Sequence, residues 1–191
     1  MIAAAIELTA RSGWSAVTMA RLADHVGVSR QTVYNEIGSK AALADAMVDH
    51  HLDQFLAVVR DAFDRHPTDL VEAIHDAVRD VLDLAAGNLL LRAIASATYG
   101  ADTELLPLLT TQANTLITRT TAMLTQRVTT YQPDLTHEQV SVVIDVIVRT
   151  VLSHVMQPAQ SPAHTADRLA WLAARVLGGQ PSRTRTPLRY R

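Results

Sequence analysis

Apolar residues recur every three or four positions along most of this 191-residue chain, and short polar stretches, glycines or prolines interrupt the pattern. This spacing is typical of amphipathic α-helices, in which residues three and four apart lie on one face. Abundant alanine and leucine also favour helix formation. The sequence therefore predicts an all-α fold of about nine helices, over 2–12, 19–26, 30–37, 40–65, 69–87, 88–98, 103–131, 136–156 and 163–177.

The predicted helix ends carry residues whose chemistry suits those positions. A side-chain oxygen at the N-cap accepts a hydrogen bond from a free backbone N–H group, and glycine readily ends a helix. Glu138 stands close behind Thr136 and suggests a capping box there. We expect N-caps at Thr18, Ser29, Ser39 and Thr136, and helix-ending glycines at Gly13, Gly27, Gly38, Gly87 and Gly178.

Helix lengths divide the chain into two parts and a tail. Short helices at the front predict a compact three-helix domain over 1–45, and longer helices predict a bundle over 46–180. The remaining segment, 181–191, is rich in arginine and proline, and we expect a flexible basic tail.

Composition excludes several classes of site. There is no cysteine, so disulfides, zinc–thiolate sites and cysteine nucleophiles are absent, which fits a cytoplasmic protein. The most apolar stretch, 140–156, is interrupted by Asp145 and Arg149, and we expect no membrane partner. The net charge of −2 is no nucleic-acid signature by itself, although residues 1–40 carry +1.

The strongest functional signal lies where Gly27 separates two short predicted helices. This is the helix-turn-helix pattern, whose second helix enters the major groove of DNA. Arginine pairs with guanine, glutamine with adenine and threonine with the thymine methyl, while tyrosine donates to phosphate. Val28 and Val33 are expected to face inward, and the side chains expected to face DNA are Arg30, Gln31, Thr32, Tyr34 and Asn35.

The stretch 13–47, GWSAVTMARLADHVGVSRQTVYNEIGSKAALADAM, resembles the DNA-binding domain of the tetracycline-repressor (TetR) family. The matching marks are the Gly-Trp pair at 13–14, Thr18, Leu22-Ala23, Gly27-Val28-Ser29, Thr32, Tyr34, Ser39-Lys40 and Leu43. The resemblance implies that Lys40, the chain's one lysine, meets a DNA phosphate at a helix N-terminus. It likewise implies phosphate contacts for Thr18 and Tyr34, and base contacts for Arg30, Gln31, Thr32 and Asn35.

Two features depart from the family pattern. Glu36-Ile37 stands where family members usually carry His-Phe, and Glu36 repels phosphates unless it turns away or accepts from cytosine. Family members also commonly begin with a short basic arm, whereas the first helix here is predicted from residue 2. The sequence leaves open whether a native N-terminal arm is missing.

The resemblance also implies a homodimer and a small-molecule pocket in the longer helices. The helices over 136–156 and 163–177 carry enough apolar surface for a two-fold interface, or for completing a monomer core. The pocket residues expected from the resemblance, each of which is also suited to an ordinary core, are Leu56, Val59, Phe63, Val78, Leu82, Ile94, Tyr99, Leu116, Thr120, Met123, Ile147, Val151 and His154. Such a lining favours a hydrophobic, lipid-like effector.

Other chemical signals are weak. The segment DHHLD, 49–53, has His and Asp at helical spacing, but an exposed helix face explains it better than a metal site does. His154 suits a core histidine. We expect no metal and no cofactor.

The sequence thus favours a cytoplasmic TetR-type repressor, a homodimer that binds a pseudo-palindromic operator and is released by an apolar effector. The alternatives are an activator of the same fold, or a helical-bundle carrier or enzyme that does not bind DNA. No nucleophile–base pair, buried carboxylate pair or phosphate loop favours an enzyme. The effector, the operator and its genes, repression versus activation, and whether two dimers share one operator stay open.

Overall fold

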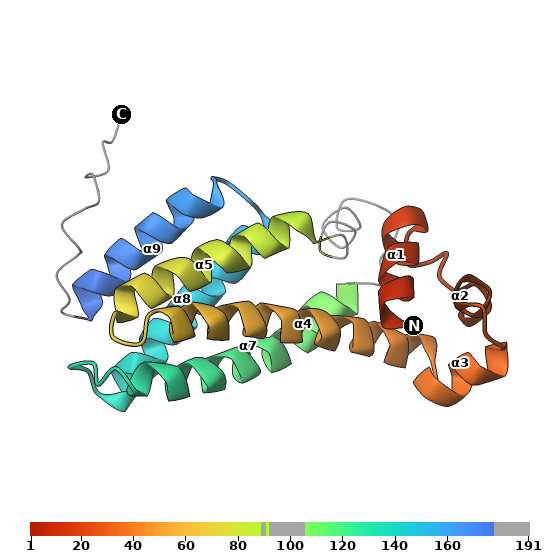
Figure 1. The fold of residues 1–191 in the computed structure, drawn as a ribbon, viewed down its shortest axis with the longest axis horizontal. Helices are drawn as coiled ribbons and strands as arrows, with labels where there is room; N and C mark the ends of the chain where they lie inside the picture. Colours follow the sequence, from red (N-terminus) through yellow and green to blue (C-terminus); the bar gives the residue numbers. More distant parts are fainter. Residues whose placement is uncertain (89–90, 92–105, 178–191) are drawn as a thin grey trace. The chain divides into compact units, whose positions relative to one another are not determined.

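The computed structural model describes residues 1–88, 91 and 106–177, and of residues 106–116 it describes the backbone alone. The regular structure of these residues is helical, which confirms the all-α prediction. The predicted helix over 88–98 falls almost entirely outside the described residues, as do 103–105 and Gly178. The helices are α1 (Ile2–Ser12), α2 (Met19–Val26), α3 (Arg30–Ile37), α4 (Lys40–Arg65), α5 (Leu70–Gly87), α7 (Leu106–Thr129), α8 (His137–Met156) and α9 (Pro162–Val176) (Figure 1).

The N-caps follow the sequence closely. The hydroxyl oxygens of Thr18, Ser29 and Ser39 accept from the backbone N–H three residues ahead, at 3.1, 3.0 and 3.1 Å. Thr136 caps α8 as predicted, but its capping-box partner is Gln139 and not Glu138. The reason is geometric, because the third residue after the cap is the one whose side chain reaches back to the cap N–H.

Among the described residues five helix ends differ from the predicted positions by one or two residues, and the start of α9 and the end of α7 show why. α9 starts at Pro162, one residue early, because Ser161 caps it and proline needs no N–H partner in the first turn. α7 ends at Thr129, so Tyr131 lies in the following turn. There Thr130 and Tyr131 donate their backbone N–H groups to carbonyls three residues back, which is the tighter pattern of a fraying helix end.

The chain forms two compact units. The first, the N-terminal unit, comprises Met1–Ala57 and Asp83–Thr120, and the second, the C-terminal unit, comprises Val58–Leu82 and Thr121–Arg191. The helices α4, α5 and α7 each contribute residues to both. The predicted domain boundary after residue 45 and the flexible tail over 181–191 stay predictions.

The N-terminal unit has a core shared by α1, α2, α3 and the first turns of α4, which lie together in Figure 1. Leu22, Val33 and Leu43 are each fully buried, and each comes from a different helix. The buried members of this core are Ala5, Ile6, Trp14, Val17, Met19, Leu22, Ala23, Val33, Leu43, Ala44 and Met47. The start of α4 is therefore part of the core that supports α3.

A second set of contacts in the N-terminal unit explains the DHHLD segment. Arg119 of α7 donates to Asp49 and to Asp53 of α4, at 2.9 Å each, so these carboxylates face a guanidinium group. His51 Nδ1 lies 2.9 Å from the Asn88 amide, and burial lowers the pKa of His51. The sequence favoured an exposed helix face for this segment, and Asp49, His50 and Asp53 are exposed, with both carboxylates in ion pairs.

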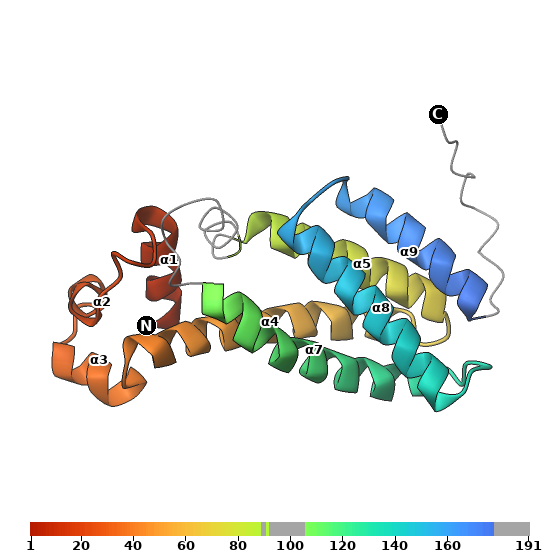
Figure 2. The ribbon, with the colours of Figure 1, turned by 180° about the vertical axis from the view of Figure 1, so that it is seen from behind.

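The C-terminal unit packs α5, α8 and α9 side by side, as both ribbon views show (Figures 1 and 2). α9 buries mostly alanines, which allow close approach of a neighbouring helix: Ala166, Ala170, Ala173 and Ala174. α8 buries a single stripe, made of Val140, Ile144 and Val148. The apolar surface predicted for the helix over 136–156 is therefore divided between one buried face and one exposed face.

Polar contacts fix the corner between α4 and α5 in the same unit. The Tyr131 hydroxyl donates to the His66 carbonyl at 2.7 Å, just beyond the end of α4. His66 Nε2 lies 2.9 Å from Asp76 of α5. Burial raises the pKa of Asp76, but hydrogen bonds from His66 and His75 outweigh it and hold the pKa at about 2. Asp76 is therefore a carboxylate at neutral pH.

Candidate DNA-binding site

The turn between α2 and α3 sets the direction of α3. Gly27 adopts the left-handed conformation, with φ 77° and ψ 32°, and its N–H donates to the Ala23 carbonyl. Ser29 then caps α3, and the fully buried Val33 holds the helix against the core. The opposite side of α3 is left for solvent or a partner.

The exposed face of α3 carries most of the residues predicted to meet DNA. Arg30, Gln31, Tyr34 and Asn35 are exposed, with Tyr34 at 51%. Thr32 differs from the expectation, because it is half-buried and its hydroxyl lies 2.9 Å from that of Ser29. Four of the five side chains are therefore presented together on one short helix.

Two of these side chains hold each other. Gln31 Nε2 donates to Asn35 Oδ1 at 2.8 Å, across one turn of α3. A pair joined in this way loses less side-chain entropy when it meets a base edge than two separate amides would. The sequence placed both residues on the DNA-facing side, but their mutual hydrogen bond follows from side-chain conformations that a residue pattern does not specify.

Lys40 lies at the first position of α4 and over an aromatic ring. Its Nζ is 4.9 Å from the centroid of Trp14, which is buried to 4% exposure. This cation–π contact joins the start of α4 to the loop after α1 and limits the side chain's freedom. The Gly-Trp pair at 13–14 is part of the resemblance to the TetR family, and in the structure its tryptophan contacts Lys40.

The arginines of this region differ in whether they form ion pairs or hydrogen bonds with the rest of the chain. Arg11 pairs with Glu7 at 3.2 Å, and Arg21 donates to the Ala16 carbonyl at 2.7 Å. Among the described residues Arg30 has no ion-pair partner, and it stands exposed at the start of α3. Glu36 is exposed near the end of the same helix. Arg30, which is itself one of the predicted base-reading residues, therefore makes fewer contacts within the chain than Arg11 or Arg21 does.

The predicted pocket residues are divided between the units. In the C-terminal unit Val59, Phe63, Val78 and Leu82 are buried, whereas Met123, Ile147, Val151 and His154 are half-buried. Leu56, buried, and Thr120, half-buried, belong to the N-terminal unit. Ile94, Tyr99 and the side chain of Leu116 lie outside the described residues. His154 Nδ1 lies 3.0 Å from the Thr150 carbonyl of its own helix, as suits a satisfied core histidine.

Comparison with known proteins decides the family. A model of bacterial regulatory proteins of the tetR family matches residues 1–47. A second model, for the C-terminal domain of the bacterial tetracycline repressor, matches residues 69–175, more than half of the chain. The chain belongs to the TetR family. The resemblance seen over 13–47 is thus confirmed, and it extends over the longer helices.

Individual relatives of this TetR-family chain agree. The HTH-type transcriptional regulator AlkX of Mycobacterium tuberculosis is 33% identical over 159 residues, which cover 83% of this chain and 74% of that protein. The crystal structure of the TetR family repressor AlkX from Dietzia, implicated in biodegradation of n-alkanes, is 29% identical with a TM-score of 0.71, covering 93% and 92% of the two chains. The fatty acid degradation regulator FadR from Bacillus halodurans shares the fold, at 18% identity, TM-score 0.57 and coverage of 94% and 97%.

Family membership settles the general class of the protein. TetR-family proteins are transcriptional regulators that bind DNA through the helix-turn-helix and act as homodimers, so the prediction that this chain is not an enzyme is confirmed. By length and composition α8 is one described helix apolar enough to cross a membrane. Since this family consists of soluble DNA-binding proteins, the open apolar face of α8 needs another explanation.

The two glycines around α3 should differ in their tolerance of a side chain. A Cβ at Gly27 or Gly38 meets no atom within 4 Å, so the cost of adding a side chain depends on the backbone conformation alone. Gly27 is in the left-handed helical region, whereas Gly38, at φ 88° and ψ −68°, is outside it. We expect Gly27→Ala to cost about 1 kcal/mol and Gly38→Ala about 2–3 kcal/mol of unfolding free energy. Urea unfolding at one fixed protein concentration measures both, and an equal loss in the two variants contradicts this account.

Proposed function

We propose that this protein is a ligand-responsive transcriptional repressor of the cytoplasm, which binds a pseudo-palindromic operator as a homodimer and is released by a hydrophobic, lipid-like molecule. The observation that carries the proposal is the distribution of exposed large apolar side chains. Seven such side chains stand out among the described residues: Tyr34 on α3, Val142, Val146 and Met156 on α8, and Trp171, Leu172 and Val176 on α9. They mark two surfaces that suit two partners, DNA and a second subunit.

The first surface suits the major groove. Arg30, Gln31 and Asn35 offer the donors and acceptors that distinguish base edges. Thr32, which is half-buried, offers a methyl group for contact with a thymine methyl. Thr18, Tyr34 and Lys40 fit the phosphates on either side, because Thr18 and Lys40 lie at helix starts and the side chain of Tyr34 is exposed on α3. Two copies related by a two-fold axis then read half-sites ~34 Å apart.

The second surface suits an isologous dimer. Trp171 is 52% exposed and Val142 57%, and leaving such groups in water is unfavourable when a matching copy can cover them. Arg149 and Asp145 form an ion pair on α8, and Arg175 lies 5.6 Å from the ring centroid of Trp171. A hydrophobic patch flanked by charged groups is the usual composition of a protein interface.

The third element is the effector. The AlkX repressor of Dietzia is implicated in biodegradation of n-alkanes, and the predicted pocket residues of this chain are almost all apolar. An alkane or an alkane-derived fatty acid is therefore the class we favour. Bound effector would favour a spacing of the two recognition helices that misses adjacent major grooves, with α4 as the moving element because it carries Lys40 at its start and Phe63 near its end.

Activation of transcription through the same fold is the remaining alternative. A non-DNA-binding carrier is disfavoured, because such a protein has no use for an exposed Arg30 beside the Gln31–Asn35 pair.

DNA binding is tested with substitutions that distinguish contacts to phosphates from contacts to bases. On an operator selected from a random duplex library, we expect Lys40→Gln to weaken binding and reduce the slope of log affinity against log salt by about 2 per dimer, one phosphate from each subunit. Arg30→Ala should cost about 1–3 kcal/mol per half-site and relax the base preference. Fluorescence anisotropy across a salt series measures both effects.

The matched control is Arg60→Gln, which removes one exposed positive charge from α4 within the C-terminal unit. Unchanged operator affinity of Lys40→Gln and Arg30→Ala, or an equal loss in Arg60→Gln, argues against the assigned roles.

The dimer surface is tested with a single charge. Val146 is 48% exposed on α8, so Val146→Glu places a carboxylate in the proposed interface without disturbing the chain's own core. We expect the wild type to be dimeric at micromolar concentration and the variant to be largely monomeric, as measured by light scattering after size exclusion. Gln126→Glu on the exposed side of α7 is the control and should stay dimeric. A monomeric wild type, or a dimeric Val146→Glu, excludes α8 as the interface.

The effector class is tested by identifying the molecule that the purified protein retains and the molecules that release the protein from its operator. We expect native mass spectrometry of the protein from its expression host to show a dimer with a fatty-acid-sized adduct. Palmitate should then raise the dissociation constant for the operator by about tenfold or more, and acetate, with the same carboxylate and no chain, should not. A bare dimer that neither palmitate nor hexadecane releases from DNA rules out this effector class and leaves DNA binding intact.

A further inference from the structure

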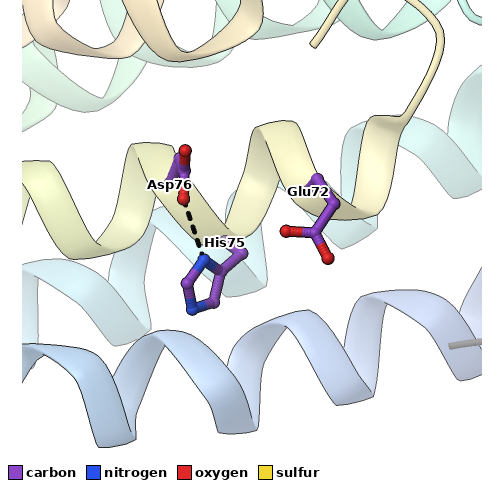
Figure 3. A group of neighbouring side chains, drawn as sticks. All are labelled: Glu72, His75 and Asp76. Carbon is purple, nitrogen blue, oxygen red and sulfur yellow. Dashed lines mark hydrogen bonds and ion pairs between the residues drawn. The ribbon is translucent and has the colours of Figure 1, made fainter. Parts of the chain in front are cut away.

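The buried His75–Asp76 pair of α5 is accounted for within the chain. His75 is 7% exposed, and its Nδ1 lies 3.0 Å from Asp76 Oδ1, as the dashed line in Figure 3 shows. A neutral imidazole with its proton on Nδ1 makes this contact a hydrogen bond. The exposed amides of Gln31 and Asn35 on α3, by contrast, keep hydrogen-bonding groups for a partner outside the chain.

Gln31 and Asn35 divide their hydrogen-bonding groups unequally. Each side-chain amide has two N–H donors and one carbonyl oxygen with two lone pairs. Gln31 Nε2 donates to Asn35 Oδ1 at 2.8 Å, which uses one donor of Gln31 and one lone pair of Asn35. After this hydrogen bond Gln31 keeps one donor and both lone pairs, whereas Asn35 keeps both donors and one lone pair.

The same hydrogen bond changes the strength of the groups that remain. Hydrogen bonds in a chain polarise one another, so an amide that has donated becomes a better acceptor, and an amide that has accepted becomes a better donor. The end of the Gln31 side chain also covers one side of Asn35 Oδ1, because the two atoms are 2.8 Å apart. Gln31 is therefore presented mainly as an acceptor with one donor beside it, and Asn35 mainly as a donor.

The pair is expected to persist when DNA approaches. Gln31 and Asn35 are four residues apart on α3, and amide pairs at this spacing stabilise a helix. Separating them in the groove, where the DNA displaces water, would leave a polar group without a partner. A base that matches the pair as it stands is therefore favoured over a base that requires the two amides to separate.

Base edges in the major groove differ in the same terms. Adenine presents one acceptor, N7, and one donor, the N6 amine, whereas guanine presents two acceptors, N7 and O6. The donor and the free carbonyl oxygen of Gln31 match adenine, and the two donors of Asn35 match guanine. Cytosine presents only the N4 amine, whose N–H groups oppose those of Asn35.

We propose that the Gln31–Asn35 pair acts as one specificity determinant, in which Gln31 reads an adenine and Asn35 reads a guanine of each half-site. This inference rests on the proposed DNA binding and extends it, because one hydrogen bond within the protein assigns the two bases. It also predicts coupling. Removal of the Gln31 amide frees Asn35 Oδ1, and a free asparagine amide pairs with the donor and acceptor of adenine.

The experiment selects operators from a random duplex library with the full-length wild type and two variants. Gln31→Met keeps the length of the side chain without its amide, so it should abolish the adenine preference and change the guanine position toward adenine. Asn35→Leu should abolish the guanine preference and leave the adenine in place. Fluorescence anisotropy on the selected operator should show that replacing either base weakens wild-type binding by about 5- to 150-fold per half-site.

The matched control is Gln126→Met, the same substitution on the exposed side of α7, and it should select the wild-type operator. Circular dichroism establishes that each variant is folded before selection. Loss of guanine in Gln31→Met together with loss of adenine in Asn35→Leu overturns the assignment, and a change at one position alone in Gln31→Met overturns the coupling. A selected operator that lacks these bases overturns this inference alone, whereas a wild type that selects no sequence overturns the proposed function as well.

Discussion

Burial of the first turns of α4 is the constraint on which the recognition surface depends. Leu43, Ala44 and Met47 are buried in the same core as α1, α2 and α3, so the three short helices do not complete a core by themselves. Val33 is held against that core, and its burial fixes which side of α3 remains outside. The position of Arg30 and its neighbours is therefore determined from the inside of the domain. Because α4 continues into the C-terminal unit with Phe63, one helix belongs to the interior of both units.

Local chemistry explains why so much of this could be predicted. An N-cap depends on one side-chain oxygen and the N–H group three residues ahead, so Thr18, Ser29 and Ser39 predict where their helices begin from four residues of sequence. The left-handed turn at Gly27 is equally local. Together they define the helix-turn-helix, and the resemblance to the TetR family followed from the same residues. Even the error at Thr136 was small, since Gln139 is the next residue after Glu138.

What the sequence did not reveal depends on residues that are distant in the chain. His75 and Asp167 are more than ninety positions apart, and nothing in either neighbourhood announces that they meet. The DHHLD segment was expected to be an exposed helix face, but its sequence could not show that Arg119 from α7 pairs with both of its carboxylates. Likewise the apolar pattern of α8 could not tell which stripe the chain covers, because that depends on how α9 and α5 pack. The pocket residues remain a prediction for the same reason.

The alanine-rich inner face of α9 has a consequence for how such regulators diverge. Ala166, Ala170, Ala173 and Ala174 face the chain's own interior, whereas Trp171, Leu172 and Val176 face outward, and the two sets share no residue. Duplicated copies of such a gene can therefore exchange their outer residues without rebuilding the subunit that carries them. In the dimer proposed above, insulation between paralogues, meaning the avoidance of mixed dimers in one cell, then requires only a few substitutions on the outer surfaces of α8 and α9.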